Sequence, residues 1–238
     1  MDRNQRHDLG VMEKAKEKEG ATKLLNELNE EPLKQKIIVN DTQNETNLHV
    51  EWWIVRHGLT PWNVERRYQG HSDQKLLSGE ASGLELLGKE IAEVSFSAIY
   101  SSDLSRCRDT LAYVRPDLQQ VAICDDRLRE LNFGEWEGQT YDMLKEDPLY
   151  RSWIDNPQEV TPPGGESWDQ FRDRVTSVYR ELMLLSHSLV VAAEQNPVIL
   201  IVTHGGVISM LSSILQPGLG FWDTKVPIGG ILRHKIQL

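Results

Sequence analysis

The chain has 238 residues, of which 39% are hydrophobic and 26% charged, a composition typical of a globular protein with one sizeable core or two small ones. The formal net charge of −10 argues against a broad surface for nucleic acid or for an anionic membrane, and two cysteines are too few for a disulfide framework. The first ten residues lack the apolar stretch of a secretory signal, and the longest apolar-rich segment, residues 182–193, is too short to span a bilayer. We therefore expect a cytoplasmic protein with no nucleic-acid or membrane partner; the oligomeric state, a homo-oligomer included, is left open.

The amino-terminal segment differs in amino-acid composition from the rest of the chain. Residues 1–49 are rich in Lys, Glu and Asn, and their short apolar stripe is limited to Leu24, Leu25 and Leu28. We interpret this segment as a charged extension that is mobile or loosely docked, and a partner-binding helix is the alternative. The predicted folded domain covers residues 50–238.

From residue 50 onward, apolar runs typical of strands alternate with helical patterns. The predicted strands cover residues 50–56, 96–102, 121–124, 197–203 and 231–238, the last at a sheet edge. The predicted helices cover residues 78–94, residues 103–114 and a segment of roughly five turns that opens with a capping box at Ser167 and Gln170. This alternation implies an α/β fold, in which a sheet with parallel neighbours carries helices on both faces.

Two of the predicted strands end in the same short pattern. The segments "WIVRHG" and "LIVTHGG" each run from a buried strand through a polar residue to a histidine and a glycine, at His57 and His204. Ligands bind at the carboxyl ends of parallel strands, and neighbouring strands would bring the two rings face to face. A lone histidine is more often structural, and a zinc pair would need further ligands that no HExxH or CxxC motif supplies. The repetition favours a functional pair without a metal.

Two arginines beside these histidines favour an anionic ligand. Arg56 directly precedes His57, and Arg106 falls in the first turn of the helix predicted at residues 103–114. A cation is unfavourable at the positive end of a helix dipole unless an anion binds in front of it, and an arginine that points to water is the alternative. Charge-assisted hydrogen bonds contribute about 1.5–3 kcal/mol each, so two guanidiniums would localise a phosphate despite the acidic exterior.

Six segments between residues 51 and 238 resemble, in content and order, the motifs of the histidine phosphatase superfamily. They are "RHGLTPWN", "YQGHSDQKLLSGE", "SSDLSRCRDTL", "LRELNFGEWEG", "PPGGES" and "VTHGG". The resemblance is to the phosphoglycerate mutase-like branch, and the fourth and fifth segments are most similar to α-ribazole phosphatases. It implies a phosphoglycerate mutase-like three-layer α/β/α fold with a mostly parallel sheet and one antiparallel edge strand. Residues 50–238 would then be the catalytic domain.

The resemblance also implies roles for the residues that match the motifs. His57 would be the nucleophile that becomes phosphohistidine, and Glu130 would be the general acid. The residues that would surround the phosphoryl group with His57 are Arg56, Arg106 and His204. The residues that would line or support the phosphate pocket are Thr60, Asn63, Gln69, Gly70 and Gly205. Leu59 stands where many family members have an acidic residue, and no metal or other cofactor is implied.

These roles agree with elementary chemistry. A neutral imidazole is a good nucleophile near pH 7, and a covalent intermediate divides one hard displacement into two easier ones. A cationic cage stabilises the charge on the transferred group. The leaving alcohol needs a proton from a carboxyl group kept protonated by burial or by negative neighbours, and Glu130 lies between apolar Leu128 and Phe133. The competing carboxylates, each with a solvated surface charge as the alternative, are Asp103, Asp125, Asp126 and Glu135.

The sequence therefore predicts a metal-independent phosphomonoesterase that acts on a small phosphorylated metabolite, such as α-ribazole 5′-phosphate or a sugar phosphate. A phosphoglycerate mutase is the first alternative, which the short segment between Glu130 and Pro162 disfavours, and a non-catalytic module that binds a phosphorylated ligand is the second. Residues 141–165 are expected to form the wall that selects the leaving group. The aromatic residues in this wall either stack on a ring or form local core under a lid: Tyr141, Tyr150 and Trp153.

Overall fold

The computed structural model describes residues 49–78, 83–192 and 195–238, so the extension of residues 1–48 lies outside the described residues. Within the described part, five strands form one sheet in the order β3-β2-β4-β1-β5. The strands are β1 (His49–Arg56), β2 (Ala98–Ser101), β3 (Ile123–Cys124), β4 (Val198–Thr203) and β5 (Ile231–Gln237). All neighbouring pairs are parallel except β1 and β5, which confirms the predicted antiparallel edge strand.

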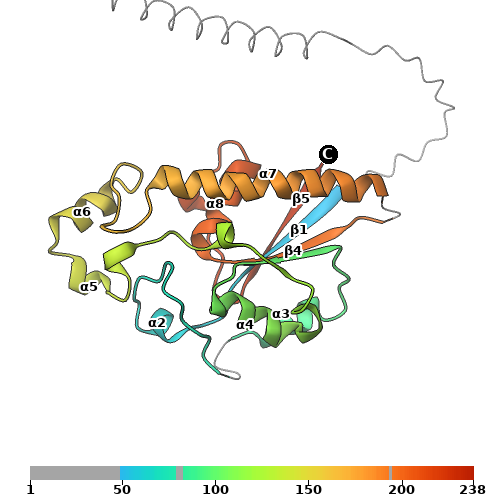
Figure 1. Ribbon diagram of the computed structural model, residues 1–238, viewed down its shortest axis with the longest axis horizontal. Helices are drawn as coiled ribbons and strands as arrows, with labels where there is room; N and C mark the ends of the chain where they lie inside the picture. Colours follow the sequence, from blue (N-terminus) through green and yellow to red (C-terminus); the bar gives the residue numbers. More distant parts are fainter. Residues whose placement is uncertain (1–48, 79–82, 193–194) are drawn as a thin grey trace, which may run out of the picture. The chain divides into compact units, whose positions relative to one another are not determined.

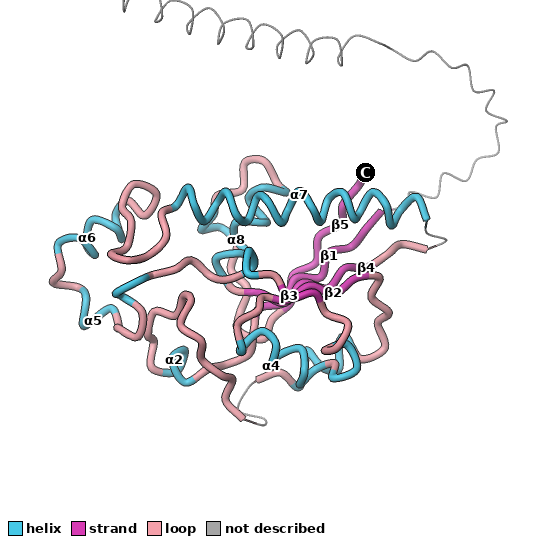
Figure 2. The backbone as a smooth tube through the Cα atoms, viewed as in Figure 1, coloured by secondary structure: helices cyan, strands magenta, loops and turns pink. Residues whose placement is uncertain are grey.

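Helices cover both faces of this sheet. The helices are α2 (Pro61–Val64), α3 (Glu85–Ile91), α4 (Ser105–Val114), α5 (Tyr141–Leu144), α6 (Pro148–Asp155), α7 (Trp168–Ala192) and α8 (Gly205–Leu215). Short 3-10 turns occur at η2 (Pro116–Leu118), η3 (Asp126–Leu128), η4 (Gly134–Trp136) and η5 (Phe221–Asp223). In Figure 1, α7 and α8 lie over one face of the sheet and α3 and α4 over the other, and Figure 2 shows the strands gathered between them. The predicted three-layer α/β/α architecture is confirmed.

The alternation of side chains along the strands divides the core into two clusters. One cluster packs Trp52 and Ile54 of β1 against Phe171 of α7 and Val207 of α8. The other packs the opposite face of the sheet against α3 and α4 and includes Val55 of β1. Successive residues of β1 are therefore buried on opposite faces, which is why its sequence reads as a continuous apolar run.

Three predicted elements differ in detail from the structure. The helix predicted at residues 78–94 is described only from Glu85 to Ile91, since residues 79–82 lie outside the described part and Gly83 has a φ of +72° that a helix does not accept. The strand predicted at residues 121–124 is reduced to Ile123–Cys124, both exposed at the sheet edge. The strand predicted at residues 96–102 is Ala98–Ser101.

The capping box predicted before α7 is confirmed. The backbone N–H of Ser167 donates to Oε1 of Gln170 over 2.9 Å, and the backbone N–H of Gln170 donates to Oγ of Ser167 over 3.2 Å. The helix that follows is 25 residues long, and its inward face carries Phe171, Val175 and Val178. Among the described residues, no helix has both the length and the apolar character required to cross a bilayer.

Candidate active site

The two strand-end histidines lie next to each other in the structure. Arg56 of β1 pairs with Thr203 of β4, so the residues that follow, His57 and His204, leave the sheet side by side. The backbone N–H of His57 donates to the carbonyl of Thr203 over 3.0 Å. The ring centroids of the two histidines are 5.1 Å apart, and both rings are almost fully buried. The parallel pairing of two adjacent strands thus positions the pair.

The environment of His57 leaves a bare nitrogen on its ring. Nδ1 of His57 lies 2.8 Å from the carbonyl oxygen of Gly58, which only accepts hydrogen bonds, so Nδ1 carries the hydrogen. Nε2 therefore carries the lone pair. Burial, and then the nearby charge of Arg106, lowers the pKa of His57 to about 3, so the ring is neutral at pH 7. The arrangement provides a neutral nitrogen nucleophile.

His204 has the opposite tautomer. Nε of Arg106 donates to Nδ1 of His204 over 3.1 Å, and an arginine cannot accept, so the ring hydrogen is on Nε2. Nε2 donates to Oγ of Ser102 over 2.9 Å and lies 3.4 Å from the sulfur of Cys107. Burial, followed by the charge of Arg106, lowers the pKa of His204 well below its usual value. His204 is thus a neutral hydrogen-bond donor beside His57.

Arg106 is fully buried in the first turn of α4 and is held by main-chain carbonyls. Its two terminal nitrogens donate to the carbonyl of Ser72 over 2.9 Å and of Gly70 over 2.6 Å. The expectation that an external anion would neutralise the start of this helix needs correction. The carboxylate of Asp73 accepts from the backbone N–H and Oγ of Ser105, both over 2.7 Å, so the chain supplies its own anion there.

Arg56 lies against the start of α8 and against the loop after it. Its Nη1 donates to the carbonyl of Val226 over 2.8 Å, and its Nε is buried with no hydrogen-bond partner among the described residues. A Cβ on Gly205 would lie 3.2 Å from the central carbon of the guanidinium, so glycine at this position leaves room for it. Arg56 and Gly205 line a hollow of about 560 Å³ whose other cation is Lys225.

Thr60, Asn63 and Gln69 form a network that leads to Arg106. Oγ1 of Thr60 donates to Oδ1 of Asn63 over 2.9 Å, and the same residues form the capping box of α2. With the amide of Gln69 oriented to satisfy both neighbours, its nitrogen donates to Thr60 over 2.7 Å and its oxygen accepts from Arg106 over 3.2 Å. Gln69 therefore links Arg106 to the fully buried Thr60.

Glu130 contacts the first turn of α8 and lines the same hollow as Arg56. Its Oε2 accepts from the backbone N–H of Gly206 over 3.0 Å, and its Oε1 accepts from the N–H of Leu131 over 3.0 Å. A Cβ on Gly206 would lie 2.2 Å from Oε1, so only glycine fits there. The two glycines after His204 therefore have separate purposes, one for Arg56 and one for Glu130. The sequence interpretation missed Gly206, although the doubled glycine of "VTHGG" is a visible signal.

Two of the competing carboxylates are engaged in ion pairs. Asp103 forms a two-pronged pair with Arg129, whose hydrogen bonds hold the pKa of this aspartate below its usual value. Asp125 forms a similar pair with Arg127 and also caps η3. Glu130 has no such partner in the described part of the chain: its contacts are backbone N–H groups. No group of three or more His, Cys, Asp or Glu side chains among the described residues is arranged to hold a metal ion.

Glu137, a carboxylate that the sequence interpretation missed, holds the loop whose carbonyls bind Arg106. Its oxygens accept from the backbone N–H of His71 over 2.8 Å, of Ser72 over 2.6 Å and of Phe133 over 3.1 Å. A Cβ on Gly70 would lie 2.2 Å from Oε1 of Glu137 and 2.4 Å from the carbonyl oxygen of Leu131, so the main chain here requires glycine. Gly70, expected to line the phosphate pocket, thus contributes its carbonyl to Arg106 and its small size to this contact.

An apolar cavity of about 370 Å³ opens beside Glu130. Its aromatic lining residues are Tyr68, Phe133, Trp153, Trp168, Phe221 and Trp222. Of the three aromatic residues expected to select the leaving group, only Trp153 lines this cavity. Tyr150 is fully buried and shares a 2.6 Å hydrogen bond with Tyr68, so the local-core alternative is correct for it, whereas Tyr141 is exposed and lies outside the lining.

The sequence pattern of the histidine phosphatase superfamily (branch 1) matches residues 52–233. The chain belongs to this superfamily. It is 31% identical over 181 residues to the adenosylcobalamin/alpha-ribazole phosphatase of Escherichia coli, covering 74% of this chain and 85% of that one. It is 34% identical to "Probable phosphoglycerate mutase GpmB" of Salmonella choleraesuis, covering 73% and 77%.

A solved structure agrees with this assignment of the family. The crystal structure of the alpha-ribazole phosphatase from Shigella flexneri superposes with a TM-score of 0.68 at 30% identity, covering 77% of this chain and 89% of that one. The recognition made from the six motifs is therefore confirmed, and so is the phosphoglycerate mutase-like fold. Members of the superfamily are phosphatases and mutases that act on small phosphorylated substrates.

Proposed function

We propose that the protein is a metal-independent phosphomonoesterase that works through a phosphohistidine at His57. The observation that carries the proposal is the bare Nε2 of a neutral His57, whose ring lies next to His204 and near the charges of Arg106 and Arg56. Nε2 attacks phosphorus while the bond from phosphorus to the leaving oxygen breaks. The positive charge that develops on the ring is stabilised at Nδ1, whose hydrogen bonds to the carbonyl of Gly58.

The remaining groups have complementary roles in this proposal. Arg56 and Arg106 neutralise the phosphoryl oxygens, and His204, whose Nε2–H donates to Ser102, packs beside the ring of His57. Glu130, as the general acid, gives a proton to the leaving alkoxide. Its carboxylate then takes a proton from water as that water attacks the phosphohistidine, so phosphate leaves and His57 is restored. Thr60, Asn63, Gln69, Gly70 and Gly205 support the arginines rather than reach the substrate.

The cavity beside Glu130 supports a substrate whose leaving group carries a flat, apolar ring. Glu130 lies in the walls of both the aromatic cavity and the charged hollow that contains Arg56. A leaving oxygen near Glu130 would thus place the phosphate towards the arginines and the rest of the molecule among the aromatic rings. This arrangement suits an α-ribazole 5′-phosphate-like metabolite better than a bare sugar phosphate.

The decisive experiment measures kcat/KM across a panel of phosphorylated metabolites in the presence of a chelator. The panel contains α-ribazole 5′-phosphate, sugar phosphates, phosphoserine and p-nitrophenyl phosphate. Phosphate release that is lost in His57→Ala supports the proposal. Absence of turnover on every member, with retained phosphate binding, would support the non-catalytic binding module instead.

A phosphoglycerate mutase is the second candidate, because a relative at 34% identity carries that name. A mutase keeps its phosphohistidine from water and returns the phosphate to a bisphosphorylated intermediate. The assay is conversion of 3-phosphoglycerate to 2-phosphoglycerate primed by 2,3-bisphosphoglycerate. Isomerisation faster than phosphate release would favour the mutase over the phosphatase.

A further inference from the structure

The position of Glu130 depends on a stretch of main chain that has little regular structure of its own. After the single 3-10 turn η3 (Asp126–Leu128), no helix or strand covers the chain until η4 (Gly134–Trp136) in this described region. Among the described residues, the carboxylate itself accepts two hydrogen bonds, both from backbone N–H groups. Something outside this stretch must therefore hold its main chain in place.

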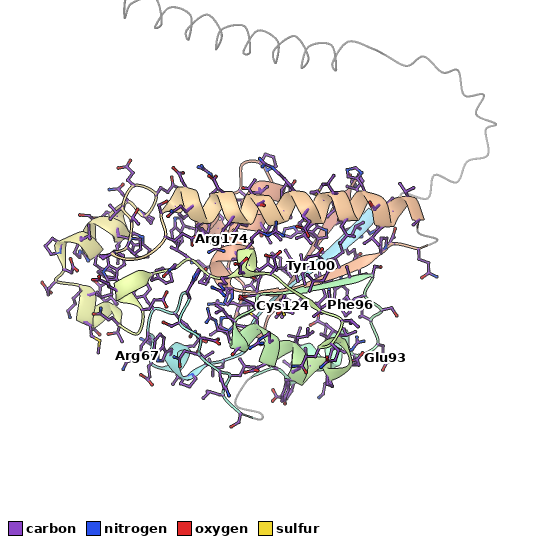
Figure 3. The ribbon with its side chains drawn as sticks, in the orientation of Figure 1. Arg67, Glu93, Phe96, Tyr100, Cys124 and Arg174 are labelled. Atoms are coloured by element: carbon purple, nitrogen blue, oxygen red, sulfur yellow. The ribbon has the colours of Figure 1, made fainter. Side chains whose placement is uncertain are left out.

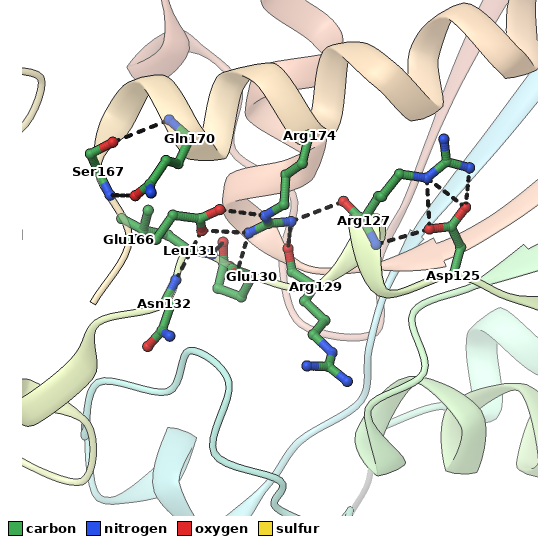
Figure 4. A network of polar contacts seen from close by, with 10 residues as sticks. All are labelled: Asp125, Arg127, Arg129, Glu130, Leu131, Asn132, Glu166, Ser167, Gln170 and Arg174. Atoms are coloured by element: carbon green, nitrogen blue, oxygen red, sulfur yellow. Dashed lines mark hydrogen bonds and ion pairs between the residues drawn. The ribbon is translucent and has the colours of Figure 1, made fainter. Parts of the chain in front are cut away.

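Arg174 of α7 makes that connection (Figure 4). Its Nη1 donates to the carbonyl of Arg127 over 2.9 Å and to the carbonyl of Arg129 over 2.6 Å. Its Nη2 donates to the carbonyl of Glu130 itself over 2.8 Å. In Figure 3, Arg174 lies below α7, on the side of the helix that faces the loops and the sheet. One side chain thus binds three of the four carbonyls of residues 127–130, the segment that carries the acid.

The guanidinium is itself fixed by Glu166. Nε of Arg174 donates to Oε1 of Glu166 over 2.6 Å, and Nη2 donates to Oε2 over 2.8 Å. The two side chains are 17% and 12% exposed, so solvent screens the pair only weakly. With the three carbonyls, this pair uses all five N–H groups of the arginine. Lysine, with three donors and no planar fork, cannot reproduce the arrangement.

Glu166 also joins the opposite end of the stretch. Its backbone N–H donates to the carbonyl of Asn132 over 2.9 Å, and its Oε2 accepts from the N–H of Asn132 over 3.3 Å. The main chain is therefore held before Glu130, at Glu130 and after it by one arginine–glutamate pair. Cζ of Arg174 lies 4.9 Å over the ring of Phe171, one helical turn away, which steadies the side chain further.

We propose that Arg174, fixed by Glu166, is a positioning residue that holds the acid Glu130 within reach of the leaving oxygen. This inference rests on the phosphatase function proposed above. A displacement of about 1 Å costs catalysis on the order of 100-fold, and a general acid matters only when the leaving group is a poor one. Loosening the pair must therefore harm the cleavage of alkyl phosphates far more than that of p-nitrophenyl phosphate, whose leaving group needs no proton.

The experiment measures kcat/KM of Arg174→Lys and Glu166→Gln on p-nitrophenyl, phenyl and alkyl phosphates. We expect a loss of about 100-fold on alkyl phosphates and less than about 3-fold on p-nitrophenyl phosphate, the same trend as in Glu130→Gln. The matched control is Arg172→Lys on the same helix, where an exposed arginine pairs with Asp169 and Asp173. It should match the unmodified protein on every substrate.

Two other outcomes separate this inference from the proposed function. An equal loss on all substrates in Arg174→Lys, beside a selective loss in Glu130→Gln, overturns the positioning role and leaves the phosphatase intact. No turnover by the unmodified protein, or no selectivity in Glu130→Gln, overturns the proposed acid and this inference with it. Thermal unfolding identifies a variant that fails to fold, in which case Glu166→Gln, which keeps the arginine and its carbonyl contacts, decides.

Discussion

Nε of Arg106 donates to Nδ1 of His204 over 3.1 Å, which places a positive charge beside two histidine rings that burial already favours in the neutral form. The fully buried guanidinium keeps its positive charge next to both rings, so a second positive charge on either ring is strongly disfavoured. The charge of the arginine is thus used twice: it would neutralise a bound phosphoryl group, and it keeps the lone pair of His57 free before that group arrives.

Replacing the nucleophile should abolish turnover. We expect His57→Gln to lower kcat on any phosphate ester by at least about 10⁴-fold, since no other described residue replaces the bare Nε2. The exposed His187 of α7 gives the control, because His187→Gln should leave kcat unchanged. Intact-mass spectrometry of a rapidly quenched reaction should find one phosphoryl group on the unmodified protein and none on His57→Gln. Full activity of His57→Gln would exclude a phosphohistidine at this position.

The low pKa of His57 predicts that the free energy of unfolding falls in acid. The pKa is about 3 in the folded protein and 6.5 in the unfolded chain, so the unfolded state binds the additional proton. The stability that His57 contributes is complete above pH 6.5 and is lost as the pH falls towards 3. Between pH 7 and pH 5 the free energy of unfolding should fall by about 2 kcal/mol because of this residue alone.

Urea unfolding at the two pH values checks this expectation in the unmodified protein and in His57→Gln. The variant should lose about 2 kcal/mol less than the unmodified protein over the same interval. His204 keeps its own contribution in both proteins, since burial and Arg106 lower its pKa as well. Equal losses in the two proteins would mean that His57 is not buried in its neutral form.

A methyl group at position 206 should displace the acid without touching the nucleophile. In Gly206→Ala the added Cβ would lie 2.2 Å from Oε1 of Glu130, so the carboxylate must move. We expect kcat/KM on alkyl phosphates to fall by about 100-fold, with a much smaller effect on p-nitrophenyl phosphate. Gly88→Ala in α3 is the control: the nearest atom is 4.0 Å away, so stability should rise by about 0.5–1 kcal/mol with activity unchanged.

Replacement of Trp222 tests whether the leaving group binds in the aromatic cavity. This tryptophan lines the cavity and is 60% exposed, so its removal should cost little stability. We expect Trp222→Ala to lower kcat/KM for a ring-bearing phosphate by about 10-fold and to leave a small sugar phosphate unchanged. Tyr141→Ala, on an exposed residue outside the lining, should affect neither substrate. A uniform effect of Trp222→Ala on both substrates would argue that the ring binds elsewhere.

The sequence predicted correctly the positions of those site residues that end or directly follow a buried strand. His57, His204 and Arg56 follow or end continuous apolar runs, and parallel strands in register bring such residues to one edge. The sequence was silent on Arg174 and Glu137, because each of them binds main-chain groups of a loop that is distant in sequence. Main-chain partners leave no residue-type pattern, so pairing a carboxylate with the N–H groups of residues 71, 72 and 133 needs the three-dimensional path of the chain.

The placement of β1 has a consequence for the order in which the domain folds. β1 (His49–Arg56) is the first strand of the sheet in chain order, yet its two neighbours are β4 (Val198–Thr203) and β5 (Ile231–Gln237). The ribosome therefore releases the strand that carries His57 well before either strand that pairs with it exists. Contacts so far apart in sequence close slowly. The nucleophile should consequently be among the last groups to reach its native surroundings, and refolding should restore helix content before it restores turnover.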